Sequence, residues 1–171
     1  MDTKTTCSNE ELKYLIALCQ QFKYRPSRLR KLLEFYSSPQ EAWERLEETK
    51  RPNLLERAQE ELEFIDKHHI RVDYFKDAHY PYRLKECPDA PILLYSKGKQ
   101  LDTSLGKFVS IVGTRNATDR GKENTRRLVL DLAASIPDVT IISGLAYGID
   151  IAAHKAALEA SIPTIIVTAH G

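Results

Sequence analysis

Glycine is confined to the C-terminal part of this chain. All seven glycines among the 171 residues lie at or after position 98, so the first 97 residues contain none. Glycine supplies the positive backbone φ angles that many turns need, whereas helices form well without it. We therefore expect a helical N-terminal part and a C-terminal part that is rich in special turns.

Helix-start signals support the first half of this expectation. Ser8 stands three residues before Glu11 and forms the S-x-x-E capping box, with apolar residues at helical spacing behind it. Similar signals recur three more times. The expected N-caps of the four helices are Ser8, Ser27, Ser38 and Asn53. The sequence thus predicts four helices within residues 8–69.

Three apolar runs, rich in β-branched residues, shape the C-terminal part. They cover residues 108–112, 139–142 and 164–168. Helical patterns over 121–135 and 149–160 separate them, with Leu128, Leu132 and Ala133 expected to face inward. A β-α-β-α-β order with almost continuously hydrophobic strands is typical of a parallel sheet that helices cover on both faces. The sequence therefore predicts an α/β fold.

The domain organisation follows from these patterns. We expect a helical domain over 1–69, a connector with short strands over 70–106, and a parallel α/β part over 107–171. Three parallel strands make only half of a doubly wound sheet. Since the chain reaches Gly171 where a further helix should follow, we expect a truncated half-sheet, either a fragment of a longer protein or an edge that a partner chain covers.

Composition excludes several classes of protein. No apolar run approaches the roughly 18–20 residues of a membrane span, and residues 1–11 lack the apolar region of a signal peptide. The three cysteines include no C-x-x-C pair, which argues against a disulfide framework and a zinc cluster. We expect a protein without a metal site, away from membranes, in the reducing cytoplasm.

Positive charge is concentrated in two segments although the formal net charge is only +1. Residues 97–127 hold eight lysines and arginines against three acidic residues, so this segment can attract phosphates at close range. A second basic run lies beside Phe22. It consists of Lys23, Arg25, Arg28, Arg30 and Lys31. Each segment is open to two interpretations: contact with phosphates, or a solvated helix face, which for the second run could also be a protein interface.

Two strand-to-helix loops are the candidate binding elements. In open parallel sheets ligands bind at the carboxyl ends of the strands, where loops 113–121 and 143–150 are expected. Each leads to a helix N-terminus, whose free N–H groups and dipole favour anions. We expect Arg115 to add a charged contact, and Gly144 to adopt a positive φ and to let a phosphate approach the backbone. Small residues and caps are also what any such turn needs.

Standard nucleotide motifs are absent. The chain has no G-x-x-x-x-G-K-[ST] motif, no G-x-G-x-x-G after the first strand, and no acidic residue closing the second strand. ATP hydrolysis and ordinary NAD binding are therefore disfavoured, and no catalytic group or cofactor is predicted. On the second sheet helix we expect His154 to be structural and to hydrogen-bond the nearby loop. Asp150 is equally explained as a helix-capping acid.

The motifs of the C-terminal part resemble those of one family. The V-G-T-R segment over 112–115, the S-G-L-A-Y-G-I-D block over 143–150 and the A-H-K-A-A-L segment over 153–158 look like the DprA/Smf family of DNA-processing proteins. Residues 80–84 and 90–98 are similar to the segment before that family's Rossmann-like core. The helical N-terminal part resembles, more weakly, the SAM-like or helix-hairpin-helix domain of some members.

The resemblance implies a function and a set of site residues. It implies a cytoplasmic protein without catalytic activity that binds single-stranded DNA, forms a homodimer when full length, and passes DNA to the recombinase RecA during natural transformation. By motif match, the implied DNA- and phosphate-binding residues are Gly113, Thr114, Arg115, Ser143, Gly144 and Gly148.

Two other functions stay open from the sequence. The Rossmann-like core is also similar to that of nucleoside-monophosphate phosphoribohydrolases of the lysine-decarboxylase-like group, whose P-G-G-x-G-T segment would fall after residue 171. A third interpretation is a protein-interaction module formed by residues 1–70 alone. A downstream P-G-G-x-G-T segment would favour the enzyme.

Overall fold

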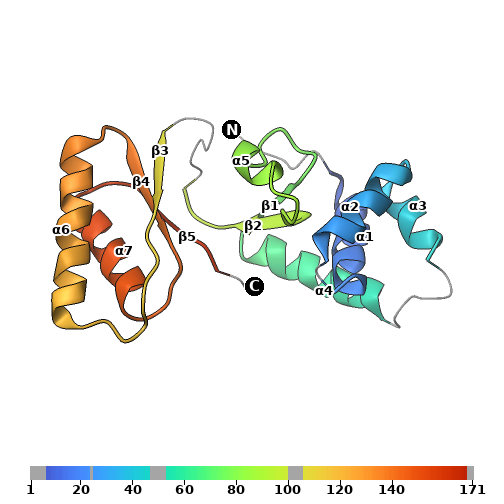
Figure 1. Cartoon of the computed structure of the whole chain (residues 1–171). Coiled ribbons are helices and arrows are strands. Elements are labelled where there is room, and N and C mark those ends of the chain that lie inside the picture. Colours follow the sequence, from blue (N-terminus) through green and yellow to red (C-terminus); the bar gives the residue numbers. More distant parts are fainter. Residues whose placement is uncertain (1–6, 24, 47–52, 100–105, 169–171) are drawn as a thin grey trace. The chain divides into compact units, whose positions relative to one another are not determined.

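The chain folds as two compact units. The computed structural model describes residues 7–23, 25–46, 53–99 and 106–168. The N-terminal unit comprises Met1–Leu101 and the C-terminal unit Asp102–Gly171. Figure 1 shows helices and a small two-stranded sheet in the first, and a three-stranded sheet with two helices in the second. The loop expected over 97–106 falls largely on residues 100–105, outside the described residues.

The four helices that the sequence predicts in the N-terminal unit are confirmed. They are α1 (Asn9–Gln21), α2 (Pro26–Phe35), α3 (Pro39–Glu44) and α4 (Leu54–Lys67), and a short α5 (Tyr82–Lys85) follows. The capping box before α1 is present, since the Ser8 hydroxyl accepts from the amide of Glu11 while the Glu11 carboxylate accepts from the amide of Ser8. Ser38 caps α3 in the same way, by accepting from the amide of Glu41.

Two of the four residues expected as N-caps, Ser27 and Asn53, make no capping hydrogen bond with their side chains. The helix α2 begins two residues earlier than predicted, with Arg25 at the N-cap, and the Ser27 hydroxyl donates to the carbonyl of Pro88 instead. Asn53 does occupy the N-cap of α4, but its φ is +63° and its side chain makes no capping hydrogen bond. Proline at the first helical position explains the shift of α2, because its fixed φ already suits a helix.

Residues 71–96 join the hydrophobic core of the helices. Here β1 (Arg71–Tyr74) pairs antiparallel with β2 (Leu93–Ser96), close to the two strands that the sequence predicts. The side chains of Val72, Phe75 and Ile92 are buried in one cluster with those of α1 and α4. Burying apolar surface in this way stabilises both the strands and the helices. The helices and the two-stranded sheet therefore form one unit.

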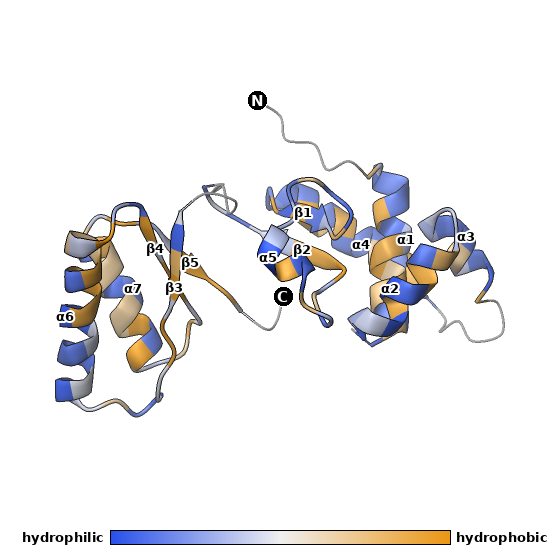
Figure 2. Ribbon diagram, turned by 45° about the horizontal axis from the view of Figure 1, so that its top comes forward, coloured by the Kyte–Doolittle hydropathy of each residue, from blue (hydrophilic) through white to orange (hydrophobic). Residues whose placement is uncertain are grey.

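The C-terminal unit is a parallel β-α-β-α-β structure, as predicted. Its elements are β3 (Lys107–Ser110), α6 (Asp119–Ser135), β4 (Val139–Ser143), α7 (Ile149–Glu159) and β5 (Thr164–Ile166). The strand order is β3-β4-β5, with Val109 opposite Ile141 and Ile142 opposite Ile165. The α/β fold is confirmed. Figure 2 shows the hydrophobic character of β4 and β5.

Both helices of this unit lie on the same face of the sheet. In Figures 1 and 2, α6 and α7 stand together on one side of the three strands, and they pack against each other. Right-handed crossovers that add strands in one direction must place successive helices on one face. The expectation that helices cover both faces is therefore wrong for the described residues of this unit.

One of the three residues expected on the inward face of α6 points to solvent instead. Leu128 is 51% exposed, whereas Val129 is fully buried and Leu132 packs beside it. The core of the unit also contains Ile141 and Ala153. The prediction for Leu128 is wrong because Leu132 lies on one helix face with either Leu128 or Val129, and spacing alone does not show which of these two neighbours is buried.

We expect the N-terminal unit to lose stability in alkaline solution. Burial raises the pKa of the Cys19 thiol to about 12 and the pKa of the Tyr80 phenol to about 12. The folded chain thus keeps protons that the unfolded chain releases. This contribution is fully present below about pH 9, the ordinary pKa of a thiol, and is lost as the pH rises toward 12.

Urea unfolding measured at pH 8 and at pH 10.5 tests this expectation. The midpoint should be lower at pH 10.5, and the difference between the two pH values should shrink in the variant Cys19→Ala. Identical midpoints at the two pH values would contradict it.

Candidate phosphate-binding edge of the sheet

The two predicted loops meet at the carboxyl ends of β3 and β4. The amide of Ile149, at the start of α7, donates to the carbonyl of Thr114 at 3.3 Å. The amide of Gly113 donates to the Asp150 carboxylate, also at 3.3 Å. The loop that follows β3 is thereby tied to the first turn of the helix that follows β4. This edge contains all six residues that the resemblance implies: Gly113, Thr114, Arg115, Ser143, Gly144 and Gly148.

Gly148 makes the close approach of the two loops possible. Its φ is +90° and its ψ is −122°, a conformation that side chains resist. A Cβ atom at this position would lie 2.2 Å from the carbonyl oxygen of Thr114 and 2.6 Å from that of Arg115. Both the backbone angles and the available space therefore require glycine.

The other two glycines of the edge are needed for packing against α7. A Cβ at position 113 would lie 2.6 Å from the Cβ of Ile149, and one at position 144 would lie 2.7 Å from Oδ2 of Asp150. The expectation of a positive φ at Gly144 is wrong, because the described glycines with positive φ are Gly98, Gly106 and Gly148. The first turn of α7 is what excludes a side chain at Gly144.

Two buried polar side chains of α7 hold the loops. Asp150 is 5% exposed and His154 is 7% exposed. Nε2 of His154 lies 2.6 Å from the carbonyl oxygen of Gly144, so this nitrogen carries a proton and donates it to that carbonyl. Nδ1 lies 2.7 Å from the hydroxyl of Thr164 in β5. The expectation that His154 hydrogen-bonds the nearby loop is confirmed.

The hydroxyl groups of the two loops are engaged within the protein. Ser143 is 3% exposed and its hydroxyl donates to the carbonyl of Ile111 at 2.6 Å. The hydroxyl of Thr114 accepts from the amide of Asn116 at 3.2 Å. Their side chains thus stabilise the loops. What the edge offers to an anion is backbone amides and the side chain of Arg115.

Helix α7 also leaves its N-terminus without a side-chain cap. Its N-cap is Gly148, and the carboxylate of Asp150 is directed to Gly113. The positive end of the helix dipole therefore lies beside the loop that carries Arg115. Arg115 is exposed and forms no ion pair with any residue that the structure describes.

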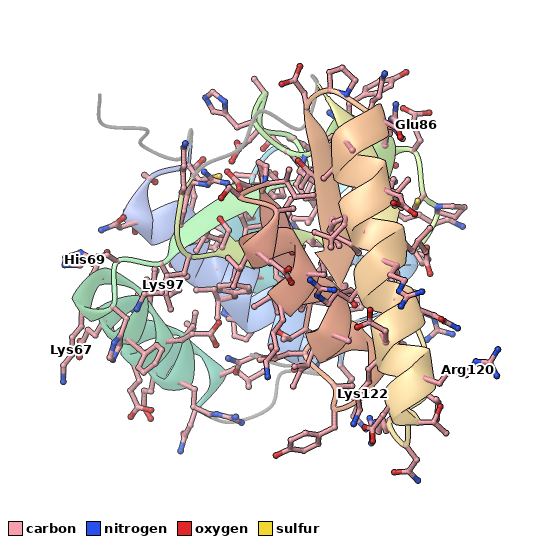
Figure 3. The ribbon with its side chains drawn as sticks, turned by 90° about the vertical axis from the view of Figure 1, so that its left-hand side faces the viewer. Lys67, His69, Glu86, Lys97, Arg120 and Lys122 are labelled. Atoms are coloured by element: carbon pink, nitrogen blue, oxygen red, sulfur yellow. The ribbon has the colours of Figure 1, made fainter. Side chains whose placement is uncertain are left out.

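Unlike Arg115, three of the cations along α6 form ion pairs. Lys122 pairs with Asp119 at 3.3 Å, Arg127 pairs with Glu123 at 3.0 Å, and Arg126 pairs with both Glu159 and Glu123. Figure 3 shows Arg120 and Lys122 extending from the first turns of α6. Beyond those turns, the basic segment is a solvated, ion-paired helix face. Arg115 is the cation that the fold presents at the strand ends.

Tyr147 is a feature of the edge that the sequence interpretation overlooked. Its side chain is 80% exposed and lines a groove of about 540 Å³ together with Gly148, Ile151 and Lys155. The same groove is also lined by Asp119, Glu123 and Glu159. An exposed aromatic ring can stack a nucleobase. The available signal was an aromatic residue set between small residues in the second loop.

Metal and membrane features are not found in the described part of the chain. There, no group of three or more His, Cys, Asp or Glu side chains is arranged to hold a metal ion. Likewise, none of the helices described combines the length and the apolar character that crossing a membrane requires.

Comparisons with known proteins match this chain to DNA-processing proteins. The chain is 37% identical to the DNA processing protein DprA of Streptococcus pneumoniae over 114 residues, which are 63% of this chain and 39% of that protein. It is 40% identical to DprA of Bacillus subtilis over 92 residues, which are 54% of this chain and 30% of that protein. The matched segments therefore cover well under half the length of these relatives.

A solved structure supports the fold. The X-ray structure of DprA from Streptococcus pneumoniae matches with a TM-score of 0.62 at 24% sequence identity, covering 96% of this chain and 58% of that one. The model of one protein family, DNA recombination-mediator protein A, matches residues 71–171. Because this match includes more than half of the chain and both loops of the site, the chain belongs to the DNA recombination-mediator protein A family.

Proposed function

We propose that this chain binds single-stranded DNA at the edge where the loops after β3 and β4 meet. Phosphates would accept hydrogen bonds from backbone amides at the N-terminus of α7 and from Arg115. Bases would stack on Tyr147. The observation that carries the proposal is the contact between the two loops, which sets the unpaired Arg115 beside the uncapped end of α7.

The wider role is part of the same proposal. We infer that the protein processes DNA in natural transformation, forms a homodimer and hands single-stranded DNA to RecA without catalysing a reaction itself. The names of the relatives, DNA processing protein DprA and Protein Smf, support a role in DNA processing. Family membership also favours this role over the phosphoribohydrolase alternative.

Replacing Arg115 should weaken the binding of oligo-dT. The variant Arg115→Ala loses a charge-assisted contact of about 1–3 kcal/mol, which corresponds to a roughly 5- to 150-fold higher Kd. Fluorescence anisotropy with labelled oligo-dT measures the change. Affinity of the unmodified chain should fall steeply with salt, because binding to phosphates releases counterions.

The matched control is Arg127→Ala on α6. It removes the same charge, but Arg127 is already paired with Glu123 on an exposed helix face. We expect this control to change Kd by less than about threefold, the scale of an exposed ion pair. Equal losses in the two variants would indicate a diffuse basic surface in place of a defined site.

A further inference from the structure

The corner between α1 and α2 contains a small basic pocket. Its volume is about 230 Å³, and its lining residues are Gln21, Phe22, Lys23, Arg25 and Arg28. The structure divides the basic run of this region in two. The guanidinium of Arg30 lies 5.1 Å from the ring centre of Phe75, where it packs against the unit itself. Lys23, Arg25 and Arg28 instead surround the pocket.

The positive charge of this pocket has no ion-pair partner among the residues that the structure describes. No carboxylate lines it, and none of its three cations forms an ion pair with another residue in the described part of the chain. Two of the last carbonyls of α1 have backbone partners of their own. The backbone amides of Phe22 and Lys23 already donate to the carbonyls of Leu18 and Gln20.

The N-terminus of α2 adds to this charge. Its N-cap, Arg25, makes no side-chain capping hydrogen bond, and its first turn contains no acidic residue. The other helices of eight or more residues that the structure describes, α1, α4, α6 and α7, each carry at least one acidic residue there. The dipole of α2 thus reinforces the positive charge of the three side chains.

We propose that this pocket binds a phosphodiester group of single-stranded DNA. Guanidinium groups match the geometry of phosphate oxygens, and Phe22 offers an apolar surface to the neighbouring nucleotide. A bound phosphate would also relieve the repulsion among three unpaired cations. The choice of ligand rests on the proposed function, whereas the pocket itself belongs to the N-terminal unit and shares no residue with the edge of the sheet.

The test measures oligo-dT binding by the full chain as a function of salt. In the double variant Arg25→Ala/Arg28→Ala, the slope of log K against log salt should become shallower by about 0.7, the contribution of one phosphate contact on a single strand. The matched control is Arg57→Ala/Lys67→Ala, which removes two exposed cations from α4. Figure 3 shows Lys67 extending away from that helix. The control should leave the slope unchanged.

Circular dichroism melts of both variants establish that the helices remain folded. A slope unchanged in the pocket variant, or reduced equally in the control, would overturn the inference. Competition by poly-glutamate as strong as by oligo-dT would overturn it too, by showing a site for any polyanion. If Arg115→Ala weakens binding and the pocket variant does not, the inference fails while the proposed function stands. If the unmodified chain binds no oligo-dT at any salt concentration, both fail.

Discussion

Replacing Gly148 with alanine should destabilise the C-terminal unit by on the order of 3 kcal/mol or more. The new Cβ would lie 2.2 Å from the carbonyl oxygen of Thr114, and a backbone atom cannot rotate away as a side chain can. The variant must also hold alanine at a φ of +90°. The clash between the new Cβ and the carbonyl oxygen of Thr114 is relieved only if the two loops separate. Oligo-dT binding should therefore be lost as well. Urea unfolding and anisotropy measure the two effects.

Gly106→Ala is the matched control for this change. Gly106 also has a positive φ, +100°, and belongs to the same unit, but its Cβ would meet only the carbonyl of Asp138 at 3.5 Å, an ordinary contact. The control thus carries the cost of backbone strain alone, about 1 kcal/mol. If Gly148→Ala lowers the free energy of unfolding no more than Gly106→Ala does, the two loops do not need their close contact.

Alanine at position 144 is expected to destabilise the same unit by about 1–3 kcal/mol, the usual cost of overpacking. Its Cβ would lie 2.7 Å from Oδ2 of Asp150, a buried carboxylate that accepts from the amide of Gly113. Since the φ of Gly144 is not positive, the clash is the main source of the cost. Displacing Asp150 would also release Gly113, so oligo-dT affinity should fall too.

A double-mutant cycle identifies the clashing partner. Asp150→Ala alone should cost about 1–3 kcal/mol by leaving the amide of Gly113 without its acceptor. In Gly144→Ala/Asp150→Ala the clash is gone, so the pair should cost at least about 1 kcal/mol less than the sum of the single changes. Gly121→Ala, whose Cβ would meet nothing closer than 3.4 Å, should combine additively with Asp150→Ala. Additivity in the first pair would show that Gly144 is required for another reason.

Local signals in the sequence predicted most of the secondary structure. The capping box at Ser8 and the cap at Ser38 are found as expected, because a cap depends on residues within one helical turn. The three apolar runs formed the three parallel strands for a similarly local reason, because their β-branched residues favour the extended conformation. Ser27 does not cap α2, and its hydroxyl instead donates to the carbonyl of Pro88, which is 61 residues away along the chain.

The candidate site was located by the sequence but explained by the structure. Loops after parallel strands meet at one edge in any such sheet, so the positions of Gly113 and Gly148 followed from strand order alone. Strand order does not show, however, why glycine is required at these positions. Gly148 is set by a carbonyl of the other loop, and Gly144 by a carboxylate six residues ahead, which only the packed fold brings within contact distance.

The sequence by itself determined the helical and α/β halves of the chain, the order of their elements and the loops of the site, since all of these depend on spacing and on local hydrogen bonds. Tertiary structure alone decided which side chains are free. Arg126 became ion-paired with Glu159 of α7 and Arg30 packed against Phe75, whereas Arg115 and Arg25 formed no ion pair among the described residues. The availability of a charge depends on partners that are distant in sequence or on the neighbouring helix, and spacing along the chain does not specify them.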